Sequence, residues 1–531
     1  MPLRSGTPKN TVEASESENG HFCIHGPTLT AYLAGGGSDY LALISGVMGL
    51  SVPARCSARM AAAASGVSGV RVEATQSGVH RFVVLGLVVT ASLLGLTACG
   101  GGMRPGVSQP PQASSLHHPA SIASTGSPLV WRVVESPNPG GPDGGNVIFG
   151  LTCSGPGACW AVGALSHSPA PLVLKLARGS WQPFELQVGS GFSETQLSAV
   201  SCVSPADCWA VGSRLSASLP PGPTQTAIWR FDGHTWRVVS SPDPGGSEAF
   251  NVMTSVSCTG PDDCWATGNS IPITTRSVLH SFLLHWNGVV WSQRPLPTPG
   301  SRSFSALELR AVTCVSGPRC WLTGSETTVN GRILSLAMVL AAGQWRVVPT
   351  PNPGSQVSWH QSLPAGSINL YPNSVGAISC PGPSDCWAAE QYLDAGGLVK
   401  GALIHFDGSR FRLVPSPSPL GLSIQSMLGG VSCPARTDCW ALEDSWPGTT
   451  PAAWARQQVY ALHFDGHAWH LVSLPNPASA GYVSPKGEII QANNVSALSC
   501  PTPGTCVAAG WFFDGQLPSG QKTLLLEGTA A

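Results

Sequence analysis

Apolar and polar residues alternate with a period of two, in short runs separated by turn-forming residues, through most of residues 129–531. One such run leads into a Ser-Cys or Thr-Cys pair. Five turn-forming residues separate that cysteine from a second, which opens another apolar run that reads C-W-A-V-G or a close variant. Alternation of this length between turn signals predicts β-strands, so the two runs predict an antiparallel hairpin.

The predicted hairpin recurs seven times along the chain. The seven copies read GLTCSGPGACWAVG, AVSCVSPADCWAVG, SVSCTGPDDCWATG, AVTCVSGPRCWLTG, AISCPGPSDCWAAE, GVSCPARTDCWALE and ALSCPTPGTCVAAG. The first cysteines of successive copies lie 49 to 67 residues apart. A repeat of this length indicates a propeller or a solenoid.

Each repeat has a second half, in which an apolar run and a run that opens with an aromatic residue flank a glycine. Residues 228–239, IWRFDGHTWRVV, are an example. Asp-Gly and Asn-Gly suit a tight hairpin because glycine tolerates positive φ. The expected turn glycines are Gly179, Gly233, Gly288, Gly343, Gly408, Gly466 and Gly528. Each repeat thus supplies four strands, a to d: before the first Cys, after the second Cys, before the glycine and after it.

The two ends of the repeat region complement each other. The seventh repeat stops after its strand c, at residues 524–528, whereas residues 131–140 (WRVVESPNPG) form a spare strand d that matches residues 236–245 (WRVVSSPDPG). A closed ring in which the first strand completes the last sheet would remove the free edges. We therefore predict an all-β fold: a seven-bladed β-propeller of four-stranded antiparallel blades over residues 129–531, closed by the N-terminal strand completing the last blade.

Fourteen of the 17 cysteines form seven pairs with identical spacing. These pairs are Cys153–Cys159, Cys202–Cys208, Cys258–Cys264, Cys314–Cys320, Cys380–Cys386, Cys433–Cys439 and Cys500–Cys506. Local disulfides in an exported protein compete here with metal ligands in a cytosolic one. The spacing differs from that of zinc sites, and no histidine recurs at a fixed offset. We therefore predict disulfides and no metal.

The Cys-paired repeats resemble the propeller repeats of exported actinobacterial proteins and, more distantly, the kelch and sialidase-type propellers. This resemblance covers about 400 residues, implies the propeller fold and an exported location, and brings no assigned activity.

An apolar stretch, residues 82–96, follows His80-Arg81 and precedes the small residues before Cys99, which predicts a secretory signal. The sequence Leu-Thr-Ala-Cys resembles the lipobox of bacterial lipoproteins, which implies that Cys99 is lipidated and anchors the protein on the outer side of the cell membrane. An uncleaved membrane helix is the alternative.

These signals divide the chain into four parts. We expect translation to begin at Val79 or at Met60, so that residues 1–78 are overhang upstream of the true start. Residues 79–98 form the signal peptide, residues 99–128 a Gly/Ser/Pro-rich tether, and residues 129–531 the propeller.

Net charge argues against nucleic acid as a partner. The chain has 27 basic and 28 acidic side chains, a net charge of −1, so it lacks the basic surface that nucleic-acid binding needs. No G-x-S-x-G, P-loop or H-E-x-x-H motif occurs, and we expect no cofactor. We expect a monomer whose partners are the membrane and a glycan or protein ligand.

Loop lengths point to one side of the propeller as the binding surface. The a–b and c–d turns are nearly constant, whereas the b–c and d–a connections vary in length, and both kinds of connection leave the same end of an antiparallel blade. Variable loops on a rigid scaffold are typical of binding sites, although neutral drift would also vary them. The candidate ligand-binding residues in these loops are Trp359, His360, Tyr371, Asn373, Trp446, Trp454 and Tyr482.

Two further functions stay open at this point. A glycan-active hydrolase or lyase would use a carboxylate pair drawn from acidic residues that we expect in loops: Glu308, Glu390, Asp394, Glu443 and Asp444. A scaffold for envelope assembly would need neither a ligand nor catalysis. The recurrent tryptophan after the second cysteine is interpreted as packing between blades rather than as a ligand platform.

Overall fold

The computed structural model describes residues 129–530, apart from 142–143, 167, 218–221, 274–278, 297–303, 316–318, 355–372, 420–424, 484–488 and 517–519, together with the backbone of β1 (Ser15–Glu16) and β2 (Phe22–Cys23). The predicted signal peptide, Cys99 and the tether lie outside the described residues.

Nearly all regular structure in the described residues is β-strand, arranged as antiparallel sets of four strands that we name sheets 1 to 7. Sheet 1 comprises β4 (Asn146–Gly155), β5 (Ala158–Leu165), β6 (Leu172–Ala177) and β7 (Ser180–Pro183). Sheet 2 comprises β8 (Phe192–Ser204), β9 (Asp207–Ser216), β10 (Thr224–Phe231) and β11 (Trp236–Val239). Sheet 3 comprises β12 (Ala249–Gly260), β13 (Asp263–Pro272), β14 (His280–Trp286) and β15 (Trp291–Arg294).

The second half of the chain repeats this arrangement. Sheet 4 comprises β16 (Phe304–Val315), β17 (Arg319–Thr328), β18 (Ile333–Ala341) and β19 (Gln344–Val348). Sheet 5 comprises β20 (Asn373–Gly382), β21 (Asp385–Leu393), β22 (Val399–Phe406) and β23 (Phe411–Val414). Sheet 6 comprises β24 (Gln425–Ala435), β25 (Asp438–Trp446), β26 (Gln458–Phe464) and β27 (Trp469–Ser473). Sheet 7 comprises β30 (Asn493–Thr502), β31 (Thr505–Phe513), β32 (Gln521–Ala530) and β3 (Leu129–Val133).

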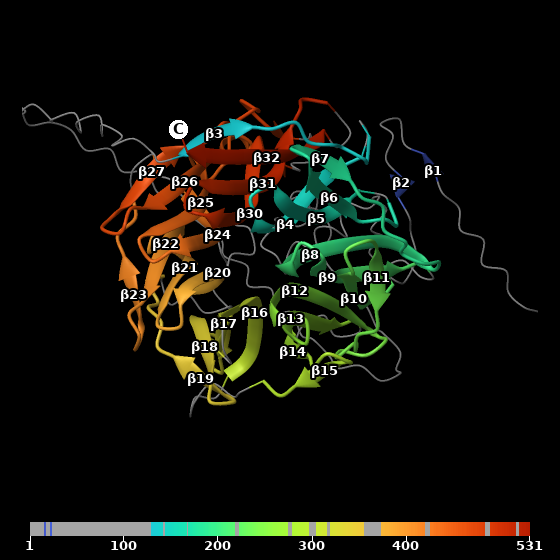
Figure 1. Cartoon of the computed structure of the whole chain (residues 1–531). Helices are drawn as coiled ribbons and strands as arrows, with labels where there is room; N and C mark the ends of the chain where they lie inside the picture. The colour runs from blue at the N-terminus through green and yellow to red at the C-terminus, as the bar shows by residue number, and fades with distance from the viewer. Residues whose placement is uncertain are drawn as a thin grey trace, which may run out of the picture. The chain divides into compact units, whose positions relative to one another are not determined.

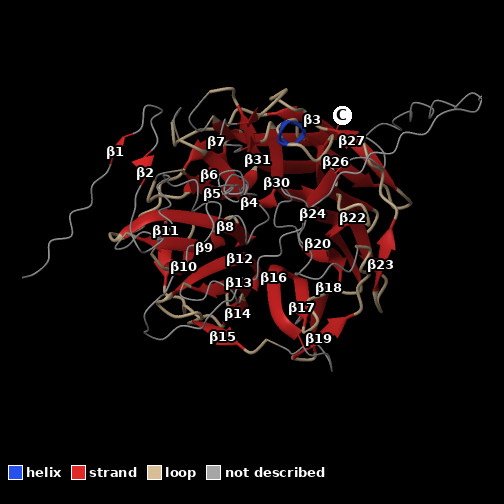
Figure 2. Cartoon of the chain, turned by 180° about the vertical axis from the view of Figure 1, so that it is seen from behind, coloured by secondary structure: helices blue, strands red, loops and turns tan. Residues whose placement is uncertain are grey.

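Three short elements lie in the connections: β28 (Tyr482–Val483), β29 (Ile489–Ile490) and the helix α2 (Pro451–Trp454), which is blue in Figure 2. Thr450 caps the N-terminus of this helix. Sheets 2 and 3 are joined into one eight-stranded sheet by a single parallel bridge between Thr224 and Phe250.

The first strand of the repeat region completes the last sheet. Strand β3 pairs antiparallel with β32, with Trp131 opposite Gly528, which confirms the pairing predicted from the split repeat. Beyond β3, the backbone N–H of Thr523 donates to Asn138 Oδ1 at 2.8 Å. The prediction of a turn at Gly528 is wrong: this glycine lies within β32, because its partner strand comes from the other end of the chain and no hairpin is needed.

The innermost strands of the sheets contact one another in sequence order, and the last returns to the first. They are β4, β8, β12, β16, β20, β24 and β30, and β30 packs against β4 (Figure 1). The hydroxyl group of Ser496 in sheet 7 donates a hydrogen bond to the carbonyl oxygen of Ile148 in sheet 1 at 2.7 Å. Sheet 7 is therefore fastened to sheet 1 as well as to sheet 6.

The recurrent tryptophan of strand b packs against the aromatic residues of the next sheet. Trp209 of sheet 2 contacts Trp286 and Trp291 of sheet 3, with ring centroids 4.9 and 5.4 Å apart. Trp440 of sheet 6 meets Trp131 of β3 at 5.6 Å. These contacts confirm the interpretation of the tryptophans as packing residues, and they extend to the strand contributed by the N-terminal end.

The connections divide the sheets into two ends. The a–b turns contain two or three residues and the c–d turns two or four, whereas the b–c connections contain four to 11 residues and the d–a connections eight to 24. We call the end with the a–b and c–d turns the hairpin side, and the end with the b–c and d–a connections the connection side. All large differences in length lie on the connection side.

Candidate functional site

Seven disulfides lie across the a–b hairpins, one in each sheet, as the cysteine spacing predicts. The Cα atoms of each pair are 4.0 or 4.1 Å apart. Disulfides persist in oxidising compartments and are rare in the cytosol. Their number indicates that the protein works in an oxidising environment outside the cytoplasm.

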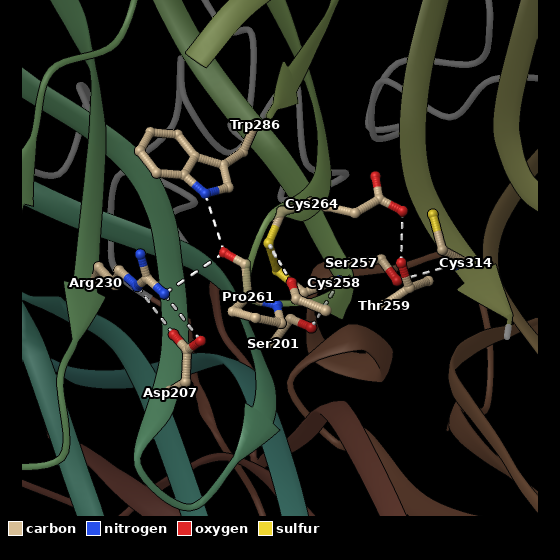
Figure 3. The surroundings of a disulfide bond; sticks show 12 residues. Ser201, Asp207, Arg230, Ser257, Cys258, Thr259, Pro261, Cys264, Trp286 and Cys314 are labelled. Carbon is tan, nitrogen blue, oxygen red and sulfur yellow. Dashed lines mark hydrogen bonds and ion pairs between the residues drawn. A yellow bond between two sulfur atoms is a disulfide. The ribbon is translucent and has the colours of Figure 1, made fainter. Parts of the chain in front are cut away.

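Serine hydroxyls link the cysteine hairpins of neighbouring sheets. The backbone N–H of Cys258 donates to Ser201 Oγ of sheet 2 at 3.2 Å, and Ser257 Oγ accepts from the N–H of Cys314 in sheet 4 at 2.9 Å (Figure 3). Three further sheet interfaces contain the same bond, from Cys433 to Ser379, from Cys500 to Ser432 and from Cys153 to Ser499. The hairpin side is thus cross-linked within each sheet and hydrogen-bonded between sheets.

Asp–His pairs are a second recurrent feature of the hairpin side. In sheet 6, Asp438 Oδ1 lies 3.0 Å from His463 Nε2, and the imidazole stacks on Trp440 with centroids 4.3 Å apart. Asp263–His285 beside Trp265 and Asp385–His405 beside Trp387 repeat this arrangement. In sheet 2, Arg230 replaces the histidine and donates two hydrogen bonds to Asp207, each 3.0 Å long.

Sequence reasoning missed these pairs, although a signal was present. An aspartate precedes the second cysteine in four repeats, and in the same four a histidine or arginine stands two residues before the Asx-Gly turn. Only the register of strands b and c brings the two together, with Trp440 opposite His463. The pairs orient the a–b hairpin and lie away from the predicted binding loops.

Buried asparagines fasten the long connections on the other side. Asn251, at the start of strand a in sheet 3, accepts a 2.8 Å hydrogen bond from the N–H of Gly245 and donates to the carbonyl of Thr224 at 3.1 Å. The equivalents in sheets 1, 5 and 7 are Asn146, Asn373 and Asn493. In these four sheets, the asparagine therefore fixes the d–a connection to the start of the strand that follows it.

The seven predicted ligand residues fall into four groups, of which the pair Trp446 and Trp454 is described below. Trp359, His360 and Tyr371 lie outside the described residues. Asn373 is fully buried: it accepts a hydrogen bond from the N–H of Gly354 in the d–a connection and donates one to the carbonyl of Ile333 in β18. Tyr482 is half-buried, with its ring 6.4 Å from that of Phe513.

Trp446 and Trp454 belong to a separate apolar cluster on the connection side of sheet 6. The two rings meet edge to face at 6.1 Å, and both side chains are buried. Leu393 and Val399, which flank the b–c turn of sheet 5, complete the cluster. The structure thus brings Trp446 and Trp454 together and packs them between two connections.

The prediction that the acidic residues of the enzyme alternative lie in loops is wrong for four of the five, which lie in β16, β21 and β25 and are inaccessible. Glu308, Glu390, Glu443 and Asp444 are each at most 4% exposed. Asp394 is half-buried and accepts hydrogen bonds from the backbone N–H groups of Gly396 and Leu398 within its own turn.

Burial changes the protonation of three of these acids. Loss of hydration raises the pKa of Glu390 to about 8, despite a hydrogen bond from Ser335. Burial likewise raises the pKa of Glu443 to about 7 and that of Asp444 to about 8, where the neighbouring Glu443 adds to the shift. In sheet 2, burial raises the pKa of Glu194 to about 7. Burial therefore keeps a larger fraction of these carboxyls protonated near neutral pH than exposure to water would.

Within the part of the chain that the structure describes, no three His, Cys, Asp or Glu side chains gather in a way that could hold a metal ion. Among those same residues no helix has the length and apolarity needed to cross a membrane.

No protein-family model matches the chain, and no curated protein matches it in sequence. Similar solved structures include a protein of unknown function from Dyadobacter fermentans, with a TM-score of 0.40 and 9% identity over 62% of this chain and 93% of that one. The Hadza microbial sialidase Hz136 has a TM-score of 0.39 and 9% identity over 69% of this chain and 74% of that one. A PL25 ulvan lyase has a TM-score of 0.41 and 10% identity over 74% and 95%. At these TM-scores the likenesses carry no argument about this chain.

Proposed function

We propose that residues 129–531 form a seven-bladed β-propeller, closed by the N-terminal strand, which acts as a non-catalytic binding module for a glycan, peptide or protein partner. Its binding surface is the connection side. The cyclic order of contacts among the innermost strands, and the pairing of β3 with β32, support the propeller.

The division between the two sides carries the functional proposal. Disulfides, serine bridges and Asp–His pairs hold the hairpin side in one repeated geometry, so it supplies a rigid base. On the connection side, the chain departs from its repeat in length and in residue type. Binding residues concentrate in loops of this kind on a rigid scaffold.

Catalysis by a carboxylate pair is the weaker hypothesis. A general acid or nucleophile must reach its substrate, and Glu390, Glu443 and Asp444 are buried between sheets. Their raised pKa values follow from burial in the fold, which explains them without a reaction.

Among the predicted ligand residues, Tyr482 is the described side chain to test first because it is partly accessible. Trp359, His360 and Tyr371 are proposed as further contacts. Asn373, Trp446 and Trp454 would contribute by holding the connections in place, since their side chains are buried.

We further propose that Cys99 is lipidated and anchors the domain on the outer side of the cell membrane. The seven disulfides support the oxidising compartment that this location requires. Metabolic labelling with a fatty-acid analogue should mark the full chain and not a Cys99→Ser variant.

The binding proposal is tested with the full chain, solubilised in mild detergent, on a glycan array and against a defined peptide library. Any ligand found should bind at least about tenfold more weakly to a Trp359→Ala/Tyr482→Ala variant. Val289→Ala is the matched control, because Val289 is an exposed residue (82%) of a c–d turn on the hairpin side. Release of shortened glycan products would instead support the glycan-active hydrolase or lyase. Absence of binding in both screens would favour the scaffold for envelope assembly.

A further inference from the structure

Sheets 5 and 6 break a rule that the other sheets follow in strand b. Five sheets have glycine at the fourth position after the second cysteine: Gly163, Gly212, Gly268, Gly324 and Gly510. A Cβ at Gly163 would lie 1.8 Å from the carbonyl oxygen of Val147 on strand a, so no side chain fits there. Sheets 5 and 6 have Glu390 and Glu443 at this position.

The facing strand a changes in the same two sheets. Each strand a carries a β-bulge opposite this position, and the bulge contains Gly376 in sheet 5 and Gly429-Gly430 in sheet 6. A Cβ at Gly376 would meet nothing within 4 Å. The glycine has thus moved from strand b to strand a, and a carboxyl group has entered strand b.

These carboxyls bridge successive sheets. Ser335 of sheet 4 donates to Glu390 Oε1 at 2.5 Å, while Glu390 Oε2 is buried without a partner. Glu443 shares a hydrogen bond with Ser426, whose hydroxyl accepts from the N–H of Gly401 in sheet 5 at 3.2 Å.

Asp444, the next residue, faces sheet 7. Its carboxyl group accepts from Asn494 Nδ2 at 3.0 Å and from the N–H of Val495 at 3.2 Å. In sheet 3 the same position is Asn269, which bonds both the N–H and the C=O of Leu309. An uncharged amide therefore performs the same bridging elsewhere in this chain.

The surroundings offer these carboxyls little compensation. The innermost strands β20, β24 and β30 carry no acidic or basic side chain. Besides the three carboxyls themselves, the second and third strands of sheets 5 and 6 carry the titratable groups Asp385, Tyr392, Lys400, His405, Asp438, Tyr460 and His463. In sheet 7, β32 carries Lys522 and Glu527, and in sheet 4, β16 and β17 carry the Glu308–Arg310 pair, Arg319 and Glu326. His405 and His463 are held by Asp385 and Asp438 at the hairpin side. Burial is the largest cause of the raised pKa values of Tyr392 and Tyr460. The charges of Asp394 and then Glu390 add to the shift at Tyr392, and the charge of Glu443 adds to it at Tyr460.

We propose that sheets 4 to 7 form a pH-responsive sector, whose interfaces are closed while Glu390, Glu443 and Asp444 are protonated and loosen when these carboxyls ionise as the pH rises through neutrality. The folded pKa values lie above the ordinary carboxyl values, so the closed form holds more protons than the open one. The stability of the closed form therefore falls as pH rises from about 5 to about 8. If the connection side binds a ligand, as proposed above, affinity would fall over the same range.

The test is hydrogen–deuterium exchange on the full chain, without any ligand, at pH 5.5 and 8.5. Wild type is compared at each pH with the variant Glu390→Gln/Glu443→Gln/Asp444→Asn, which removes the ionisation and keeps the acceptors. At pH 8.5, peptides from β21, β25 and β30 should exchange at least about tenfold faster in wild type than in the variant. At pH 5.5 the two proteins should agree within about twofold.

Sheet 3 is the internal control, because Asn269 occupies the position of Asp444 there and β13 should exchange alike in both proteins. Equal exchange of β21, β25 and β30 at pH 8.5 would overturn the proposal, as would an equal acceleration of β13. If the triple variant fails to fold, Asp444→Asn alone should slow exchange in β25 and β30 at pH 8.5, and no slowing would overturn the proposal. Because no ligand is used, the outcome is independent of whether the connection side binds one.

Discussion

The hairpin side and the connection side of the sheets are built from the same repeated strands, yet they differ in how closely the repeats agree. On the hairpin side, seven disulfides share one spacing, and serine hydroxyls link the cysteines of neighbouring sheets. On the connection side, d–a connections range from eight to 24 residues. The hairpin side is therefore nearly the same in every sheet, whereas the connection side differs from sheet to sheet.

This difference shows where each kind of residue is tolerated. On the hairpin side, polar groups such as Asp438 and His463 meet a partner in their own sheet. Toward the connection side, Glu390 and Asp444 reach across to the neighbouring sheets. The contacts between sheets therefore recur on the hairpin side and differ from one interface to the next toward the connection side.

Reduction of the disulfides should have the largest effect, because it removes the covalent part of the hairpin side. Each short loop contributes about 2 kcal/mol in the chain-entropy model. Seven such contributions are comparable with the whole stability of a typical domain, about 5–15 kcal/mol. Excess reductant should abolish the near-UV circular dichroism or lower Tm by tens of degrees, and an unchanged melting curve would show that the disulfides are dispensable.

Alanine substitutions of one glycine in sheet 1 and one in sheet 5 should have different effects on stability. Gly163→Ala places a methyl group against the carbonyl of Val147 and should destabilise the fold by about 2–4 kcal/mol. Gly376→Ala enters open space and should change stability by no more than about 0.5 kcal/mol. Chemical denaturation measures both, and equal effects would contradict the conclusion that the strand-b position of sheet 1 requires glycine whereas the strand-a position of sheet 5 does not.

The smallest expected difference in stability is between substitutions in two Asp–His pairs of sheet 6, one buried and one exposed. Asp438→Asn weakens the bond to His463, whose side chain is 10% exposed, and should cost about 1 kcal/mol. Asp465→Asn affects the bond to His470, whose side chain is 39% exposed, and should leave Tm unchanged. A larger effect at Asp465 would reverse the order of importance assigned to the two pairs.

The sequence was sufficient for the repeat, its strands and the disulfides, because these depend on local spacing. The spare strand at Trp131 and the missing strand after Leu526 also predicted the pairing of β3 with β32, since the two fragments complete one repeat. The geometry of the c–d turns was harder to predict from the sequence. The Asp-Gly turns span four residues, in which Asp232 accepts from the N–H groups of His234 and Thr235, whereas two-residue turns occur at Arg178-Gly179 and Ala342-Gly343.

The candidate site was less predictable because its residues meet across sheet interfaces. Glu390 reaches Ser335 and Asp444 reaches Asn494, contacts between residues 50 or more positions apart. Polarity alone suggested solvated loop carboxylates, whereas the register of β21 and β25 buries them. Trp446 and Trp454 were similarly assigned to loops, and only the packing of the b–c connections of sheets 5 and 6 shows that they contact each other.

Closure of the ring by the first strand is the central claim of the proposed propeller, and an engineered cross-link tests it directly. Val130 and Thr529 are directly opposite in β3 and β32, as the native cysteines are in their hairpins. In the full chain, Val130→Cys/Thr529→Cys should form an eighth intrachain disulfide in peptide maps, whereas Val130→Cys/Glu527→Cys, two residues out of register, should not. Absence of the link in the first variant, or a link between two chains, would contradict a ring closed by its own N-terminal strand.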